Sequence, residues 1–268
     1  MRYCNFSIVK ESSSKSRLDK LLLDRGLVPS RERAQALVLA GKVLVNGQKI
    51  EKSGATVDAS SEIRLLGDDL KYVGRGGLKL ERALQHWNID VRDRVCIDVG
   101  ASTGGFTDCL LQHGAARVIA IDTGQGQIAF QLRQDPRVRL LDKTNARYLT
   151  REQLGEAADF IAVDVSFISA TLVLPAVISA AFSHDNDESG DAGARAGREL
   201  VVLVKPQFEV GRDRVGKGGI VRDAAAQQQA VEKIRTAVQA FSPASIDVIE
   251  SPILGVEGNR EFLLYAKF

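Results

Sequence analysis

The fold of this 268-residue chain is constrained most by the stretch Val95-Cys-Ile-Asp-Val-Gly-Ala-Ser-Thr-Gly-Gly-Phe106. It predicts a buried strand over residues 95–99, a tight glycine-rich turn, and the first residues of a helix. Glycine is needed where a backbone turns sharply or approaches a ligand closely. A helix that begins directly after such a turn leaves its first backbone N–H groups free. The stretch therefore predicts a ligand-binding turn.

The residues of this turn favour one class of ligand. A dinucleotide-binding turn needs glycine at its first, third and sixth places. Here Gly100, Ser102 and Gly105 stand at those places, so the glycine that admits a pyrophosphate is missing, and Asp98 adds a negative charge. S-adenosylmethionine, with its sulfonium, ammonium and ribose groups, suits such a turn better than a phosphate does. The expected cofactor-binding residues here are Asp98, Gly100, Ala101, Ser102, Thr103, Gly104 and Gly105.

Strand and helix patterns alternate after the turn, which is typical of a parallel sheet covered on both faces. We expect strands near residues 95–99, 117–121, 137–141, 159–164 and 200–205, and helices near 105–113, 125–134, 150–155, 168–182 and 224–241. Two last strands, near 246–251 and 261–268, are expected to form an antiparallel edge. With this cofactor, the pattern predicts an α/β fold over residues 75–268: a Rossmann-like class I methyltransferase with a seven-stranded, mostly parallel sheet.

The first quarter of the chain has a different pattern. Residues 1–15 predict a flexible polar leader, and the leucines at 18, 21 and 22 predict a helix. Ser30 is a suitable N-cap for a second helix, and the run Gly41-Lys-Val-Leu-Val-Asn-Gly47 predicts a short strand and a tight turn. Over residues 16–66 this order resembles the S4 RNA-binding domain, a small α+β module. Residues 67–74 are expected to be a linker.

The charge of the chain is distributed unevenly. Residues 1–60 hold eleven Lys and Arg against six Asp and Glu, whereas the remainder has a net charge of −3. A basic module favours a polyanionic partner such as nucleic acid. By the S4 resemblance, Arg17, Arg31, Arg33 and Lys42 are the expected RNA-binding residues, and they would bind phosphates. Arg17-Leu18-Asp19 also resembles the catalytic R-L-D of pseudouridine synthases, but no synthase body follows, so we interpret it as a coincidence.

Polar residues follow the expected strands at the edge where open α/β sheets bind ligands. They are Asp98, Asp122, Asn145, Asp164 and Lys205. A carboxylate at Asp122 can accept hydrogen bonds from both hydroxyls of an adenosine ribose. We therefore add Asp122, Asn145 and Asp164 to the expected cofactor-binding residues.

Four runs resemble the TlyA family, also called haemolysin A, which belongs with the FtsJ-like ribose methyltransferases. These runs are Asp98-Val-Gly-Ala-Ser-Thr-Gly-Gly-Phe-Thr107, Thr144-Asn-Ala-Arg147, Asp164-Val-Ser-Phe-Ile-Ser169 and Val204-Lys-Pro-Gln-Phe-Glu-Val-Gly211. FtsJ-like enzymes use a Lys-Asp-Lys-Glu tetrad, and the resemblance implies Lys79, Asp164, Lys205 and Glu261 as its catalytic members. The residues alone leave Lys79 open as a solvated helix residue and Glu261 as a strand-end charge.

The resemblance implies methyl transfer from S-adenosylmethionine to the 2′-hydroxyl of a cytidine in ribosomal RNA, with that RNA or a ribosomal subunit as partner. Family members that modify both subunits carry extensions at both ends. This chain ends at Phe268 directly after the last expected strand, so large-subunit RNA is the expected target. We expect no metal, because three scattered histidines and three cysteines show no ligand spacing. No signal-peptide core is evident, so a cytoplasmic location is expected, and the oligomeric state stays open.

Three other functions stay open from the residues. A non-catalytic RNA-binding or ribosome-assembly factor would show a degraded cofactor turn or lack a tetrad lysine. A membrane-active haemolysin needs a spanning or amphipathic segment, and residues 165–183 carry no charge over 19 positions. Four serines, Thr171 and Pro175 in this run favour a strand end followed by a buried helix, so no membrane partner is expected. A small-molecule methyltransferase is disfavoured by the basic S4 module.

Overall fold

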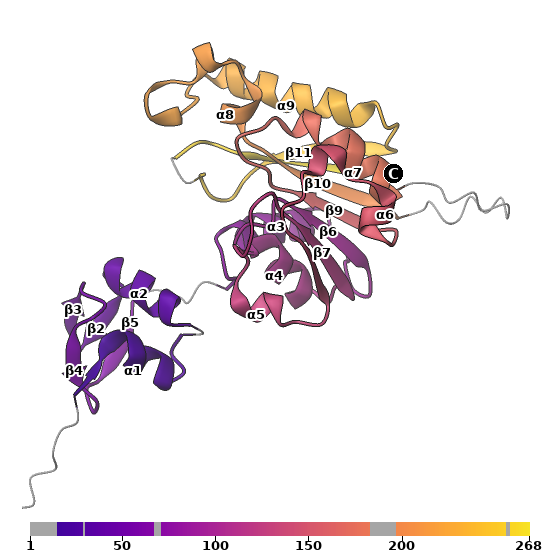
Figure 1. The fold of residues 1–268 in the computed structure, drawn as a ribbon. Coiled ribbons are helices and arrows are strands. Elements are labelled where there is room, and N and C mark those ends of the chain that lie inside the picture. Colours follow the sequence, from indigo (N-terminus) through magenta and orange to yellow (C-terminus); the bar gives the residue numbers. More distant parts are fainter. Residues whose placement is uncertain (1–14, 29, 67–70, 183–196, 256–257) are drawn as a thin grey trace, which may run out of the picture. The chain divides into compact units, whose positions relative to one another are not determined.

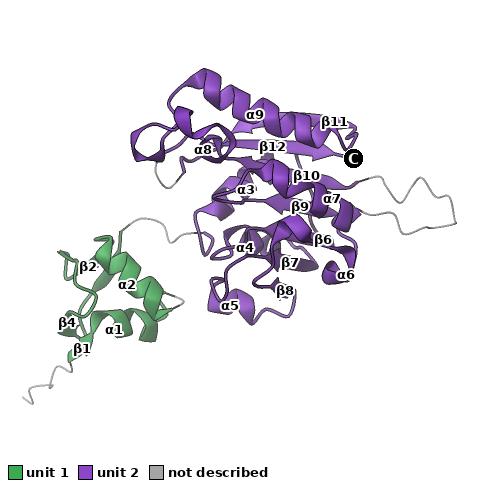
Figure 2. Cartoon of the chain, turned by 45° about the horizontal axis from the view of Figure 1, so that its top comes forward, with its two compact units in different colours: residues 1–69 green, residues 70–268 purple. Residues whose placement is uncertain are grey.

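The structure is a computed structural model that describes residues 15–28, 30–66, 71–182, 197–255 and 258–268. The chain divides into two compact units, Met1–Asp69 and Leu70–Phe268 (Figure 2). Residues 1–14 of the expected leader and residues 67–70 of the expected linker lie outside the described residues.

The small unit packs two helices against a three-stranded antiparallel sheet (Figure 1). The helices are α1 (Leu18–Asp24) and α2 (Arg31–Leu39), and the strands are β2 (Val43–Val45), β3 (Gln48–Ile50) and β5 (Ile63–Leu65). Leu18, Leu22 and Val38 are fully buried between them. Ser30 caps α2, since its Oγ accepts the N–H of Arg33 at 3.2 Å. The predicted helix, cap and strand order of this unit is confirmed.

A two-stranded sheet at the start of this unit was not expected. Strand β1 (Lys15–Arg17) pairs antiparallel with β4 (Thr56–Asp58), and Leu18 then donates its N–H to the carbonyl of Ala55 at 2.8 Å. β1 contains no apolar residue, so it lacks the alternation that predicts a strand. Its pairing fixes the place where α1 begins.

The large unit contains a seven-stranded sheet in the order β11-β12-β10-β9-β6-β7-β8 (Figure 2). Its strands are β6 (Val95–Val99), β7 (Arg117–Ile121), β8 (Val138–Leu141), β9 (Phe160–Val163), β10 (Glu199–Val204), β11 (Ser245–Glu250) and β12 (Phe262–Lys267). Strands β6 to β10 pair in parallel, whereas β12 runs antiparallel to both β10 and β11. The predicted fold class and the antiparallel edge are confirmed.

Helices cover both faces of this sheet, and each face has its own hydrophobic core. One core includes α3 (Gly76–His86), α4 (Gly105–Gln112) and α5 (Phe130–Arg133), and the other includes α6 (Arg151–Leu154), α7 (Leu174–Phe182) and α9 (Ala224–Gln239). Leu80, Ala83 and Leu84 are buried on α3, and their spacing of three and four residues is that of one helix face. Short helical turns complete the unit: η1 (Ala146–Tyr148), η2 (Ala170–Leu172), α8 (Pro206–Glu209), η4 (Arg212–Arg214) and η5 (Lys217–Gly219).

Two expected helices are shorter in the structure. The helix expected over 125–134 is reduced to α5, because Gly126 has a left-handed backbone with φ of +69°. The helix expected over 168–182 is split into η2 and α7. Pro175 has no N–H to continue a helix from the preceding turn, so α7 begins at Leu174.

Residues 71–74 differ from the linker that the sequence predicts. Tyr72 is only 2% exposed, and its ring lies against Gly77, where a Cβ atom would come within 2.3 Å of it. Val73 donates its N–H to a carboxylate oxygen of Asp108 at 2.7 Å. This segment therefore packs onto the large unit as the lead-in to α3.

The described part of the uncharged run, residues 165–182, forms no long helix. It contains η2 and α7, and most residues of the nine-residue α7 are buried in the core of the large unit. The predicted strand end followed by a buried helix is confirmed. Among the helices that the structure describes, none combines the length and the apolar composition that crossing a bilayer requires.

Candidate active site

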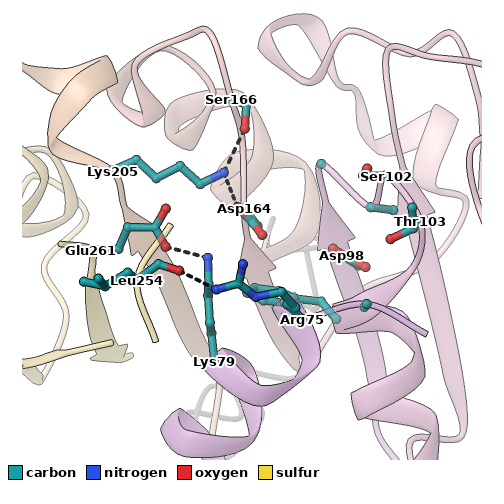
Figure 3. A pocket seen from close by; sticks show the side chains of 16 residues that line it. Arg75, Lys79, Asp98, Ser102, Thr103, Asp164, Ser166, Lys205, Leu254 and Glu261 are labelled. Carbon is teal, nitrogen blue, oxygen red and sulfur yellow. Dashed lines mark hydrogen bonds and ion pairs between the residues drawn. The ribbon is translucent and has the colours of Figure 1, made fainter. Parts of the chain in front are cut away.

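A cavity of about 350 Å³ lies at the carboxyl end of the parallel strands, where Figure 3 shows the side chains that line it. Its walls come from segments far apart in the chain: the start of α3, the turn after β6, and the residues that follow β9 and β10. The loop before β12 closes the remaining side. Open α/β sheets bind ligands at this edge.

The four tetrad residues expected from the sequence all line this cavity, where they form two ion pairs. Lys79 Nζ lies 2.5 Å from Glu261 Oε2, and Lys205 Nζ lies 2.5 Å from Asp164 Oδ1 (Figure 3). Lys79 is only 7% exposed and Glu261 only 3%. The interpretation of Lys79 as a solvated helix residue is therefore wrong. A lysine and a glutamate buried together in a cavity wall are costly without mutual pairing.

Two further polar residues line the same cavity, and the sequence patterns did not single them out. Ser166 Oγ accepts a hydrogen bond from Lys205 Nζ at 2.8 Å, so Lys205 is held between two oxygen partners. Arg75 donates from Nη2 to the carbonyl of Leu254 at 3.0 Å. Ser166 lies two residues after Asp164, within one of the four runs that resemble the TlyA family. Its place in that run is the sequence feature that could have identified it as a site residue.

Asp98 is fully buried beneath the turn that it precedes. Its Oδ2 accepts the backbone N–H of Thr107 at 2.9 Å and the hydroxyl of Thr107 at 2.6 Å. Helix α4 follows Gly104, which has no side chain for capping, so Asp98 caps the helix from the preceding strand. Its Oδ1 is buried without a hydrogen-bond partner. Burial raises the pKa of the Asp98 carboxyl to about 7, against the hydrogen bonds from Thr107.

The glycines of the turn are required by close packing of the protein itself. Gly100 has φ of +88°, and a Cβ there would lie 2.3 Å from the carbonyl oxygen of Asp164. Gly104 has φ of +96°, and a Cβ there would lie 2.3 Å from Leu132. Ser102 occupies the place of the missing glycine with φ of +48°. The sharp turn predicted from the sequence is present. Its backbone at Gly100 packs closely against the carbonyl group of Asp164 at the end of the neighbouring strand.

A second cavity of about 300 Å³ lies on the other side of Gly100 and Ser102, and Asp164 lines both. Asp122 follows β7 and lines this second cavity. Its Oδ2 accepts the N–H of Ser102 at 2.8 Å, and its Oδ1 accepts the N–H of Gly124 at 2.7 Å. Asn145 also lines the cavity, where its Oδ1 accepts the N–H of Arg147 at 3.1 Å. Each carboxylate oxygen of Asp122 keeps one lone pair for a ligand hydroxyl.

The expected RNA-binding residues lie in the small unit. Arg17 and Arg31 are about half exposed, and both form ion pairs with Asp19 at 2.9 Å. Arg33 is half-buried in the first turns of α2, and Lys42 is exposed directly before β2. Within the part of the chain that the structure describes, no group of three His, Cys, Asp or Glu side chains could hold a metal ion.

Comparison with known proteins agrees with this architecture. The FtsJ-like methyltransferase family matches residues 72–268, and the S4 domain family matches residues 16–63. The 16S/23S rRNA (cytidine-2′-O)-methyltransferase TlyA of Mycobacterium tuberculosis is 42% identical over 94% of this chain and 90% of its own length. The chain belongs to the TlyA family of FtsJ-like methyltransferases. The resemblance that the four sequence runs indicate is thereby confirmed.

Two further members of the family bear on its function. The 23S rRNA (cytidine-2′-O)-methyltransferase TlyA of Campylobacter jejuni is 32% identical over 88% of this chain and 93% of its own length. A solved structure from Streptococcus thermophilus, named as a candidate hemolysin, is 41% identical with a TM-score of 0.68, covering 95% of this chain and 89% of its own. The family therefore carries two kinds of name, for an RNA methyltransferase and for a hemolysin.

Proposed function

We propose that this chain transfers a methyl group from S-adenosylmethionine to the ribose 2′-hydroxyl of a cytidine in ribosomal RNA. One observation carries the proposal: Lys79, Asp164, Lys205 and Glu261 come from four segments and line one cavity beside the glycine-rich turn. An amine beside a weakly acidic hydroxyl can take up its proton as the oxygen attacks. The S4 domain supports an RNA substrate for this chemistry.

The residues of the two cavities fit the cofactor. The unpartnered Asp98 Oδ1 suits a cationic group, and the Asp122 carboxylate suits the hydroxyls of a ribose. Asn145 and Ser102 line the second cavity with Asp122, and Thr103 lines the first cavity with Asp98. When bound, S-adenosylmethionine supplies an activated methyl group on a sulfonium. Asp164, which lines both cavities together with Gly100, Ser102 and Ser166, would lie beside its methyl donor end.

The chain itself contributes a proton acceptor and the alignment of the reacting hydroxyl. Lys205 Nζ is the acceptor in this proposal, since Asp164 and Ser166 hold it from two sides. It must give up its own proton before it can act. Lys79 is held by Glu261 and supplies a donor that can orient the same hydroxyl. Holding oxygen and methyl in line contributes much of the rate.

The two TlyA relatives differ in substrate, because one is named for 16S and 23S rRNA and the other for 23S rRNA alone. Large-subunit RNA is common to both names, so we propose it as a substrate of this chain. This substrate implies action in the cytoplasm. We infer no action on small-subunit RNA from these names.

The test is mass-spectrometric mapping of ribose methylation in both rRNAs, with the gene intact, deleted, or replaced by variants. We expect one cytidine in large-subunit RNA to lose its methyl group on deletion and to stay unmethylated with Lys205→Ala. Lys267→Ala is the matched control, since this exposed lysine ends β12 at the opposite edge of the sheet. Purified Lys205→Ala should still bind RNA. Substantial turnover by this variant would remove Lys205 from the role of proton acceptor.

The same strains test the remaining alternatives. A non-catalytic assembly factor predicts unchanged methylation on deletion. A hemolysin predicts that Lys205→Ala lyses erythrocytes as wild type does while wild type methylates no RNA. A small-molecule methyltransferase predicts turnover without RNA. Each result would contradict the proposed function directly.

A further inference from the structure

Asp19 of the small unit is a buried carboxylate that has no part in the methyl transfer proposed above. Asp19 in α1 is fully buried and accepts five hydrogen bonds. Arg17 donates to it from Nε at 3.0 Å and from Nη2 at 2.9 Å, and Arg31 donates from Nε at 2.9 Å. Gln35 donates from Nε2 at 3.0 Å and Lys20 from its backbone at 2.9 Å. The hydrogen bonds from Arg17 hold the pKa of this carboxyl well below its usual range, so it stays charged.

The two arginines that meet at Asp19 come from different elements. Arg17 ends β1, whereas Arg31 begins α2, and the side chains of both are about half exposed. Asp19 occupies Nε and Nη2 of one guanidinium and Nε of the other. Because a guanidinium carries five N–H donors, further donors remain on the exposed side of each. The carboxylate thus holds two cations next to each other that would otherwise repel.

We propose that Asp19 is a positioning residue that holds Arg17 and Arg31 as a preformed pair for phosphate groups of the RNA backbone. This inference rests on the proposed function, since it names how the S4 domain meets its RNA. A free arginine side chain loses rotamer freedom when it binds, and an arginine already held in place loses less. Guanidinium groups also match phosphate oxygens in a bidentate geometry.

Simple charge counting predicts the opposite effect, which makes the inference testable. Removing a negative charge from an RNA-binding unit increases its net positive charge and should strengthen binding to a polyanion. Removing the carboxylate that positions two arginines should weaken it. The sign of the change therefore separates a positioning role from a bystander role.

The experiment compares Asp19→Asn with Asp24→Asn in the full chain, using a transcript of large-subunit rRNA at fixed salt. Asp24 ends the same helix and is exposed, so this control makes the same charge change without the arginine contacts. We expect Asp19→Asn to weaken RNA binding about fivefold to tenfold, a loss of pre-organisation. We expect Asp24→Asn to bind as wild type or slightly more tightly. KM for RNA should rise in Asp19→Asn while kcat changes less than about twofold.

Two further variants keep the test decisive if Asp19→Asn destabilises the small unit. Arg17→Lys keeps the charge but cannot bind Asp19 in bidentate fashion, and we expect it to weaken RNA binding to a similar extent. Asp19→Asn added to Arg17→Ala and Arg31→Ala should cause no further loss, because residues that act together are not additive. Failure of wild type to bind the transcript would overturn the proposed function. Binding by wild type, with equal or tighter binding by Asp19→Asn, would overturn only this inference.

Discussion

Asp98 is fully buried, yet only one of its two carboxylate oxygens has a hydrogen-bond partner. In the unfolded chain such a carboxyl ionises near its ordinary pKa of about 3.9. Its folded-state pKa is raised to about 7 by burial and by the nearby Asp164 and Asp122. Between these two values the folded protein holds a proton that the unfolded chain has released. The free energy of unfolding therefore falls as pH rises from about 4 to about 7.

Asp98→Asn keeps an oxygen for Thr107 and removes the charge, so at pH 8 the ligand-free variant should be more stable than wild type. The gain should be on the order of 3 kcal/mol and should disappear below about pH 4. Thermal unfolding at several pH values measures it. Lower stability of the variant at pH 8 would contradict the raised pKa.

The same substitution should harm cofactor binding. The charged carboxylate is the form suited to the cationic groups of S-adenosylmethionine, so wild-type affinity should weaken as pH falls below about 7. Asp98→Asn should bind at least about tenfold more weakly at pH 8, with an affinity that changes little with pH, because the variant cannot form a charge-assisted hydrogen bond there. Isothermal titration calorimetry provides the comparison. A steep pH dependence that persists in the variant would assign the titration to another group.

At the scale of elements, the loop after β9 depends on one glutamate. Glu209 ends α8, is only 8% exposed, and accepts the N–H of Ala170 at 2.7 Å and the hydroxyl of Ser169 at 2.5 Å. Lys233 of α9 forms an ion pair with it at 3.1 Å. The three interactions tie α8, α9 and the start of η2 together. They thereby fix the segment that carries Asp164.

Glu209→Ala should leave a buried N–H at Ala170 without its partner and loosen this segment. We expect the free energy of unfolding to fall by about 1 to 3 kcal/mol, and kcat to fall about tenfold as Asp164 and Lys205 lose alignment. Chemical denaturation and methylation of rRNA at saturating substrate measure the two effects. Glu232→Ala is the control, because this half-exposed residue of α9 contacts only its own helix, through a hydrogen bond from Gln228 at 3.0 Å and an ion pair with Arg235 at 3.6 Å among the described residues. A Glu209→Ala enzyme with wild-type kcat would contradict the positioning role.

The sequence predicts those features that follow from apolar periodicity or from the binding of ligands at the carboxyl ends of parallel strands. The strand over 95–99 and the buried face of α3 follow from apolar spacing. The strand ends near the cavity follow from the topology of parallel sheets, which is why Asp164 and Lys205 could be selected. The five hydrogen bonds of Asp19 join residues up to 16 positions apart, and the unpartnered oxygen of Asp98 depends on packing. Both depend on tertiary placement, so spacing alone could not predict them.

At the scale of the whole chain, positive charge is concentrated in the first 60 residues, which include most of the S4 domain. Residues 1–60 carry an excess of five positive charges, whereas the rest carries an excess of three negative ones. RNA binding that depends on phosphate contacts releases counterions, so its affinity falls steeply with salt. The S4 domain should therefore supply most of the salt dependence. The cavities of the large unit should supply the chemistry.

A double variant in the S4 domain separates these contributions in the intact chain. The double variant Arg33→Gln with Lys42→Gln should bind a large-subunit rRNA transcript more weakly. Its plot of log affinity against log salt should be shallower by about 0.7 to 0.9 for each RNA phosphate that the variant no longer binds. Its affinity for S-adenosylmethionine should match wild type, because the cofactor cavities lie in the other unit.

The matched control is Arg92→Gln with Lys267→Gln, which removes two charges from the large unit. Both residues lie at the end of the sheet where the parallel strands begin, away from the cavities. This control changes the net charge of the chain by the same amount as the first double variant but leaves the S4 domain intact. If both double variants lower the salt slope equally, net charge alone explains RNA affinity. If only the first does, the phosphate-binding residues belong to the S4 domain.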